Sequence, residues 1–270
     1  MRAGIKLRWA WVACVLAEAT ASAHEPWGSE LGQSDAEQPE RYQTLNKGRL
    51  PDLIPLTVGA STDTTTVGGQ VSFHSIVQNP FIRPNDTTGF SAVDASATFY
   101  LGTPSQPVLK LSKTSPGVTI AAGNSHTLVI GWNVPSTFMP GNYGFYVFAD
   151  ADDTVAERDE TNNVLIAATT LTLLPQPPGA VTAAQTTPKQ ERKVLVQFAR
   201  SPSSGVARYI VHRGGVAIAK LPPCRASCAY VDTVEEDGTY EYSARAVAIN
   251  QKAEFVSNAS SSASVAVSAM

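Results

Sequence analysis

Short apolar runs that alternate with polar residues recur along this chain, and they constrain its fold more than any other feature. Strand-sized runs fill residues 53–174 and 180–267, with glycine, proline and other turn residues between them. A period of two places alternate side chains on one face of a strand, so one face can be buried. Val71, Phe73 and Val77 show this pattern in one of the runs. The Gly214-Gly215 pair between two later runs predicts a β-hairpin, because glycine reaches positive φ without a steric cost. The sequence therefore predicts an all-β fold made of many short strands.

A proline-rich stretch separates the two sets of runs. Residues 175–179 read Pro-Gln-Pro-Pro-Gly, which cannot continue a central strand and forms a stiff spacer. At 270 residues the chain is long enough for two domains with cores of their own. We therefore predict one β-sandwich over residues 51–175 and a second over residues 178–268.

The first residues indicate export. A positively charged start precedes an apolar run over residues 9–17, which is too short to span a bilayer, and residues 21–23 fit a small-residue cleavage site. We therefore predict a signal peptide over residues 1–23, no transmembrane anchor, and a secreted or periplasmic location. Residues 24–50 are polar and have no sustained apolar period, so we expect a flexible N-terminal arm.

The charge balance and the missing motifs exclude several classes of function. Removal of residues 1–23 takes Lys and Arg from 20 to 17 and Asp and Glu from 23 to 22, which leaves a net charge of −5. Nucleic-acid binding requires clustered Lys and Arg, so we expect no nucleic-acid partner. The chain also lacks the G-x-S-x-G and H-E-x-x-H motifs and a phosphate-binding glycine loop. We therefore expect no enzymatic activity.

Two of the cysteines, Cys224 and Cys228, would remain after cleavage. Cysteines of an exported chain are expected to pair, so we predict a disulfide that fastens a short loop. For a ring of this size the loop-entropy model gives a stabilisation of about 2 kcal/mol. A metal site would need two further ligands, and none lies nearby in the sequence.

An acidic stretch from Asp150 to Asn163 lies between two apolar runs, residues 143–149 and 164–174, which are candidate strands. The stretch allows two interpretations. In the first, it is a structural corner: the acids accept backbone N–H bonds, Asn takes left-handed geometry, and Val155 fills the sandwich end. In the second, its oxygens bind calcium, which needs about six to eight oxygen ligands, although the spacing is not that of an EF-hand. We favour the corner and keep calcium as the alternative. The candidate calcium ligands are Asp150, Asp152, Asp153, Glu157 and Glu160.

A copper site is a further hypothesis. Cleavage would make His24 the N-terminus, and copper oxygenases that attack polysaccharides use such a histidine with a second one. His74 and His126 lie in predicted strands and could supply the second ligand. However, the polar stretch after His24 does not have the pattern of a strand, so we do not favour this site.

The segment from about residue 51 to residue 174 resembles CARDB, a bacterial family described as related to cell adhesion. The matching residues are Pro51-Asp52-Leu53, the strand Val71–Asn79, Leu128, Trp132, Gly141, Tyr143, Asp150, Val155, Glu157, Glu160, Asn162 and Asn163. The resemblance implies an immunoglobulin-like β-sandwich without a catalytic site, used as an interaction or spacer module. It makes Glu157, Asn162 and Asn163 determinants of the corner. Residues 82–94 form a longer insertion than usual, whose role is open.

Residues 178–268 resemble a bacterial fibronectin type III domain. The resemblance is carried by Tyr209–Gly215, Asp232-Thr233, Gly238–Tyr242, Ala246, Asn250 and Ser257-Asn258. It makes Tyr240 the tyrosine-corner residue, whose hydroxyl ties the preceding loop to the core. Together the two resemblances predict two consecutive immunoglobulin-like sandwiches in an exported, non-enzymatic adhesion or interaction module, with protein or carbohydrate as partner. The alternatives are a calcium-stabilised spacer and a carbohydrate-binding accessory protein.

Overall fold

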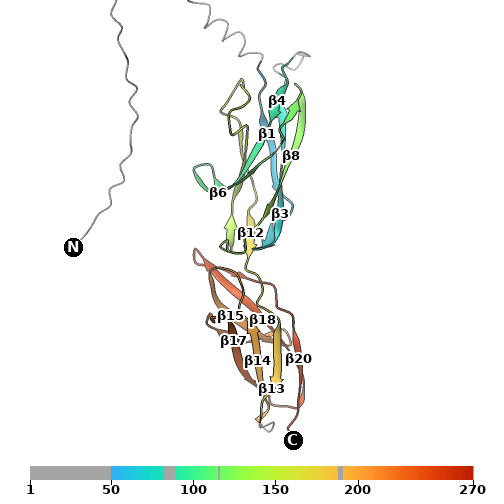
Figure 1. Ribbon diagram of the computed structural model, residues 1–270, viewed down its shortest axis with the longest axis vertical. Helices are drawn as coiled ribbons and strands as arrows, with labels where there is room; N and C mark the ends of the chain where they lie inside the picture. The colour runs from blue at the N-terminus through green and yellow to red at the C-terminus, as the bar shows by residue number, and fades with distance from the viewer. Residues whose placement is uncertain (1–49, 82–88, 115, 188–190, 270) are drawn as a thin grey trace, which may run out of the picture. The chain divides into compact units, whose positions relative to one another are not determined.

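The computed structural model describes residues 50–81, 89–114, 116–187 and 191–269, which form β-strands and no α-helix (Figure 1). The strands make two β-sandwiches, the first from β1 to β12 and the second from β13 to β20. The predicted all-β, immunoglobulin-like fold class is therefore confirmed. The predicted signal peptide and all but the last residue of the predicted arm lie outside the described residues.

The first sandwich is built from two facing sheets and two smaller strand groups. Its strands are β1 (Ile54–Ala60), β2 (Thr64–Thr66), β3 (Gln70–Asn79), β4 (Ala92–Ala95), β5 (Ala97–Thr103), β6 (Gln106–Lys113), β7 (Val118–Ile120), β8 (Asn124–Asn133), β9 (Gly141–Tyr143), β10 (Phe145–Ala149), β11 (Val164–Ile166) and β12 (Leu171–Leu174). One facing sheet has the order β1-β3-β8 and the other β11-β10-β5-β6. The smaller groups are β2-β12-β9 and β4-β7.

The alternating pattern of the sequence produces the core between these sheets. Phe73 on β3 is fully buried, with its ring centroid 5.2 Å from that of Phe145 and 6.2 Å from that of Phe99. Trp132 on β8 is partly buried and packs against the same core cluster. A continuous core of this kind supplies most of the stability of a small sandwich, because it removes apolar surface from water.

Two runs that the sequence pattern predicts as continuous strands are divided in the structure. The run over residues 143–149 is interrupted at Gly144, so β9 pairs with β12 whereas β10 lies between β11 and β5. The central position of β10 agrees with its apolar residues on both faces. The run over residues 164–174 likewise separates into β11 and β12. At the end of the insertion, residues 92–95 form β4, which pairs with β7.

The second sandwich is formed by the remaining strands. They are β13 (Val181–Gln185), β14 (Lys193–Ala199), β15 (Val206–Arg213), β16 (Val216–Leu221), β17 (Ser227–Thr233), β18 (Gly238–Asn250), β19 (Ala253–Val256) and β20 (Ala263–Val267). One sheet has the order β13-β14-β17, and the other has the order β16-β15-β18-β19. The long strand β18 also pairs with β20, next to its pairing with β19.

The second core is separate from the first and has its own aromatic pair. The ring centroids of Phe198 on β14 and Tyr209 on β15 lie 5.4 Å apart, edge to face, inside a cluster that begins at Val181. The hairpin between β15 and β16 turns at Gly214 and Gly215, whose φ angles are 55° and 81°. Glycine reaches such angles without a steric cost, as the Gly-Gly pair in the sequence indicated.

Candidate functional site

The acidic stretch between β10 and β11 folds into a corner anchored to the first sandwich. The backbone N–H of Ala149 donates to the carbonyl of Asn163 at 2.8 Å, and the N–H of Asp150 donates to the carbonyl of Ser96 at 2.9 Å. Val155, in the middle of the corner, is only 6% exposed and belongs to the core cluster. The corner is therefore packed into the sandwich instead of forming a free loop.

Asp150 fixes the first bend of the corner. Its φ is 47°, and its carboxylate accepts hydrogen bonds from Thr154 Oγ1 at 2.6 Å and from the Val155 N–H at 2.7 Å. Asp153 is also left-handed, with φ at 53°. The left-handed positions thus belong to these aspartates and not to Asn163, which corrects the expectation from the sequence. Asp tolerates this region for the same reason as Asn, because its short polar side chain can bond to the nearby backbone.

Glu157 lies at the centre of the corner and is 2% exposed. Its carboxylate accepts hydrogen bonds from the Leu53 N–H and, at 3.0 Å, from Asn163 Nδ2. The pKa of Glu157 is raised to about 8, chiefly by burial; the nearby carboxylates of Glu160 and Asp150 add to this shift, and the two hydrogen bonds oppose it. This carboxyl group is therefore largely protonated at neutral pH, which reduces the cost of burying it.

A second branch of the network centres on Asp52, which is 1% exposed. Its carboxylate pairs with the Arg158 guanidinium and accepts a hydrogen bond from Asn162 Nδ2 at 2.9 Å. The Asp52 N–H donates to Asn79 Oδ1 at 3.2 Å, and Asn79 Nδ2 donates to the carbonyls of Phe90 and Ile120 at 2.9 Å each. The corner is thereby joined to the chain entering β1 and to the end of β3. The sequence pattern did not single out Asn79 or Arg158, and only the match of Pro51-Asp52-Leu53 pointed to Asp52.

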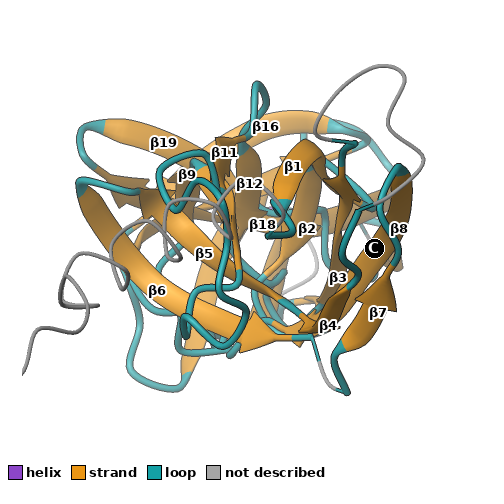
Figure 2. Cartoon of the chain, turned by 90° about the horizontal axis from the view of Figure 1, so that it is seen from above, coloured by secondary structure: helices purple, strands orange, loops and turns teal. Residues whose placement is uncertain are grey.

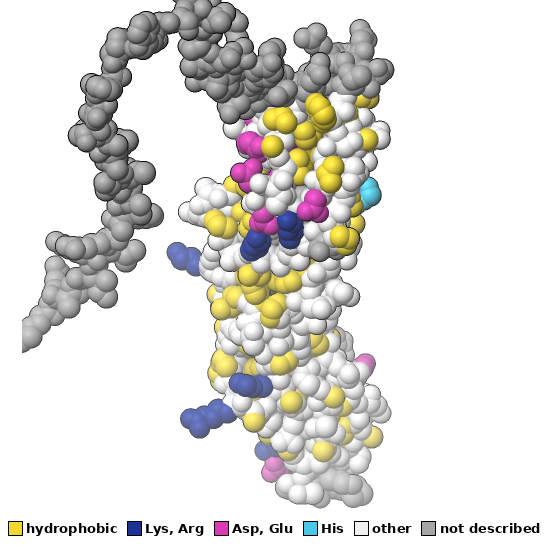
Figure 3. All heavy atoms as spheres, turned by 45° about the horizontal axis from the view of Figure 1, so that its top comes forward, with side chains coloured by type: hydrophobic (Ala, Val, Ile, Leu, Met, Phe, Trp, Pro, Cys, Tyr) yellow, Lys and Arg dark blue, Asp and Glu magenta, His cyan; other side chains and the backbone are white. Residues whose placement is uncertain are grey.

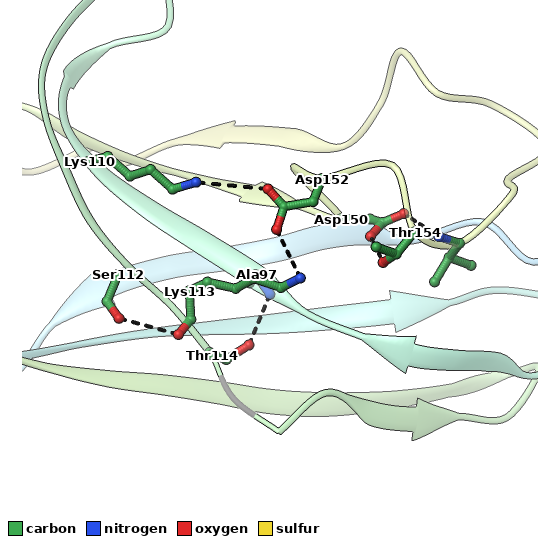
Figure 4. A network of polar contacts seen from close by, with 9 residues as sticks. Ala97, Lys110, Ser112, Lys113, Thr114, Asp150, Asp152 and Thr154 are labelled. Atoms are coloured by element: carbon green, nitrogen blue, oxygen red, sulfur yellow. Dashed lines mark hydrogen bonds and ion pairs between the residues drawn. The ribbon is translucent and has the colours of Figure 1, made fainter.

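Asp152 has a different environment at the surface of the same corner. Lys113 Nζ lies 2.9 Å from one carboxylate oxygen and Lys110 Nζ lies 3.8 Å from the other, as Figure 4 shows. The hydrogen bond with Lys113 lowers the pKa of Asp152 and raises that of Lys113. Acidic and basic side chains also lie next to one another on the surface of the first sandwich in Figure 3. Because the charges are exposed, these pairs contribute little to stability.

Four of the five acids proposed as calcium ligands have separate partners. Asp150 binds Thr154 and Val155, Asp152 faces the lysines, and Glu157 binds Leu53 and Asn163. Glu160 Oε1 accepts the N–H of Glu157 at 2.9 Å, and the Asp153 side chain is exposed. Among the described residues, no group of three or more His, Cys, Asp or Glu side chains is placed to hold a metal. Calcium binding at the corner therefore stays a prediction.

A polar cluster of the second sandwich surrounds Asp232, which is 6% exposed. Its Oδ2 accepts hydrogen bonds from Tyr242 Oη and from Arg213 Nη1, each at 2.7 Å. Burial, followed by the nearby Asp232 carboxylate, raises the pKa of Tyr242. Tyr240 Oη donates to the carbonyl of Glu236 at 2.9 Å, so this hydroxyl ties the loop before β18 to the strand.

Two further features of the second sandwich lie near its loops. Cys224 and Cys228 form a disulfide, and Cys228 is buried in the core. Beside the Asp232 cluster is a hollow of about 320 Å³. It is lined by Arg213, Thr233, Val234, Glu235, Glu236 and Tyr240.

Fold and polar clusters together define the class: a protein of two immunoglobulin-like β-sandwiches whose buried charges hold strand ends and loops in place. The CARDB family model matches residues 50–167, so this segment contains a CARDB domain. No curated protein matches the chain. In the part of the chain that the structure describes, no helix has the length and apolar character needed to cross a membrane.

Several solved structures are similar to parts of the chain. The CARDB domain of a Pyrococcus furiosus protein, determined in complex with di-metal ions, is 18% identical over 46% of this chain and 90% of its own, with a TM-score of 0.32. A domain of a putative cell surface protein from Methanosarcina acetivorans is 18% identical over 46% of this chain and 93% of its own, with a TM-score of 0.32. The fibronectin(III)-like modules of CbhA from Clostridium thermocellum are 15% identical over 78% of this chain and 94% of theirs, with a TM-score of 0.26.

Proposed function

We propose that this protein is an exported, non-enzymatic interaction module that binds protein or carbohydrate through its sandwich loops or strand edges. The CARDB match over residues 50–167 is the observation that carries the proposal. CARDB and fibronectin III-like domains are generally non-catalytic and typical of extracellular adhesion or interaction modules, and a rigid sandwich that presents variable loops is suited to binding.

The polar clusters of the chain support the proposed binding function, because their buried acids hold the loops in place. The carboxylates of Glu157 and Asp52 each accept hydrogen bonds from neighbouring backbone or side-chain groups. Groups held in this way stabilise loops and leave other side chains of the same loops exposed to a partner. The loop before β18 is an example, because its Glu235 and Glu236 side chains are exposed beside the hollow.

A retention experiment tests the proposal. The purified protein is immobilised and incubated with material released from a bacterial cell surface, either untreated, digested with protease, or digested with glycosidases. Retained material that protease destroys identifies a protein partner, and material that only glycosidases destroy identifies a carbohydrate. No retained material from any preparation contradicts the proposed function.

A loop variant shows whether the partner contacts the hollow of the second sandwich. Changing Glu235 and Glu236 together to Ala removes two exposed acids, while the backbone carbonyl that accepts the Tyr240 bond remains. We expect a loss of retention of tenfold or more if this loop is the contact. The matched control is Asp63→Ala, which removes an exposed acid from the first sandwich.

The calcium-stabilised spacer is the second candidate, because the corner contains several carboxylates. The melting temperature is measured with millimolar calcium and with a chelator, for the protein and for Asp153→Asn. We expect equal melting temperatures, since Asp150, Asp152 and Glu157 already have partners in the structure. A rise with calcium that Asp153→Asn reduces would favour the spacer over the interaction module.

A further inference from the structure

Strand β8 is an edge strand with an open side. It is the terminal strand of the sheet β1-β3-β8, and no other strand of the described part of the chain pairs with its second side. Figures 1 and 2 show β8 together with β6, the edge strand of the facing sheet, which contacts β8 without pairing with it. β8 pairs with β3 over ten residues, Asn124 to Asn133, without any shift in register, so its backbone is regular along its whole length.

The hydrogen bonds to β3 show which backbone groups of β8 face outward. The Val134 N–H donates to the carbonyl of Gly69 at 2.9 Å, and this pair continues the β3–β8 register. In an antiparallel ladder, residues on one strand direct both N–H and C=O alternately to one side and to the other. The odd-numbered residues of β8 therefore direct these groups to the open side. They are Ser125, Thr127, Val129, Gly131 and Asn133, and all are exposed.

β6, another long edge strand of this sandwich, has features that discourage edge pairing and that β8 lacks. β6 contains Pro107, Lys110 and Lys113, and its pairing with β5 has two register shifts. Proline, lysine and bulges are the devices by which proteins prevent edge strands from pairing with other chains. β8 has no proline, no charged Lys, Arg, Asp or Glu side chain, and no shift. Its open side is thus fit for pairing.

We propose that β8 pairs antiparallel with β8 of a second copy of this chain, which joins two three-stranded sheets into one. A second copy fits because the edge is uncharged, so two identical edges meet without repulsion. A two-fold axis perpendicular to the joined sheet keeps the core-facing side chains of both copies on the same face. Odd-numbered residues of one β8 therefore pair with odd-numbered residues of the other. Placing the axis at Val129 pairs residues 125–133 of the two strands, with Thr127 opposite Gly131 and Ser125 opposite Asn133. Val129, which is 55% exposed, then meets Val129 of the partner.

The pairing does not depend on the proposed binding of an external partner. Self-association is read from the purified protein alone, whereas the retention experiment needs cell-surface material. A failed self-association test therefore does not contradict the proposed binding of an external partner, and a failed retention test does not contradict the pairing of β8.

A cysteine at the axis tests the register. In Val129→Cys the two thiols lie on residues whose Cα atoms are about 5.5 Å apart, a distance that suits a disulfide. We expect most of the purified chain to become a disulfide-linked dimer under mild oxidation. The matched control is Ser125→Cys, in which the two cysteines are about 26 Å apart from the rise per residue and do not link. A peptide map locates the bond.

Opposite charges at the same position test whether the edge drives association. Sedimentation should show a dimer for the unchanged protein, monomers for Val129→Lys and Val129→Glu, and a restored dimer when the two variants are mixed. Val108→Lys is the control, because it places the same charge at an exposed position of β6, and this variant should remain dimeric. The restored mixture excludes misfolding as the cause of the monomers.

Two results overturn the proposal. One is an unchanged protein that remains monomeric at high micromolar concentration and gives no linked Val129→Cys dimer, as occurs if another segment covers the edge. The other is a dimer that persists in Val129→Lys, or equal linking of Val129→Cys and Ser125→Cys, which assigns the association to another surface.

Discussion

Asn163 Nδ2 donates a 3.0 Å hydrogen bond to Glu157 Oε1 in the corner of the first sandwich, where both residues are 2% exposed. Glu157 also accepts the N–H of Leu53, so one carboxyl group joins the start of β1 to the start of β11. These segments are far apart in the chain, and their contact closes the first sandwich.

Asn163→Ala should lower the free energy of unfolding by about 1 to 2 kcal/mol, because a buried carboxyl oxygen loses its donor. Chemical denaturation at pH 7 measures the change. Asn258→Ala, at an exposed position of the second sandwich, is the control and should change stability by less than about 0.5 kcal/mol. An unchanged midpoint in Asn163→Ala would show that other contacts hold the corner.

Glu157 should make the first sandwich less stable as the pH rises. Its pKa of about 8 in the folded protein is above the ordinary value of 4.5, so between these values the folded state binds more protons than the unfolded state. The free energy of unfolding then falls with rising pH, at a rate of about 1.4 kcal/mol per pH unit for one proton, and levels off above pH 8. Denaturation at several pH values from 5 to 9 measures this slope.

Glu157→Gln should remove that slope and still fold. Asn163 Oδ1 is buried without a hydrogen-bond partner among the described residues, so a turned Asn163 amide can accept a hydrogen bond from the new Gln amide. Asp63→Asn, which changes an exposed acid away from the corner, is the control and should retain the slope. A slope that survives in Glu157→Gln would assign the titration to a different group.

Asp150 should contribute through both its conformation and its hydrogen bonds. Asp150→Ala loses two bonds and places Ala at φ 47°, so it should lower the free energy of unfolding by about 2 to 4 kcal/mol. Asp150→Gly relieves the conformational cost and should be less harmful. Asp153→Ala, at φ 53° with an exposed side chain, measures the conformational cost alone. Equal stability of Asp150→Ala and Asp153→Ala would exclude a contribution from the bonds.

The disulfide should stabilise the second sandwich only modestly. Replacing Cys224 with Ser and Cys228 with Ala should lower the free energy of unfolding by about 2 kcal/mol, because the ring is short. Reduction of the unchanged protein should have the same effect, and the reducing agent should leave the double variant unaffected. A much larger loss on reduction would mean that the bond holds more than its own loop.

Periodic patterns were the most reliable guide to the fold. The alternation of Val71, Phe73 and Val77 predicted β3, and Gly214-Gly215 predicted the hairpin between β15 and β16. The break at Gly144 could not be predicted from the apolar run. It arises because the strands on its two sides have different partners: β9 pairs with β12, and β10 pairs with β5. The sequence pattern also did not predict the short strands β2 and β4, because they are defined by their pairing with the distant strands β12 and β7.

For the corner, the sequence located the acids but not their partners. Glu157 and Asn163 lie close together in the sequence, so a local pattern could predict their contact. Asp52 and Arg158 pair across more than a hundred residues, and no local pattern reveals such a contact. The separation of Asp152 from Glu157 likewise arises from the position of β6, which brings Lys113 to Asp152.

The sequence by itself determined the all-β class, the two sandwiches and the acidic corner, because periodicity and turn chemistry act over a few neighbouring residues. Only the tertiary structure decided that Glu157 is buried against Leu53, that Asp152 faces lysines, and that β8 has an open edge. These features depend on which distant strands become neighbours, and that is set by packing of the whole core.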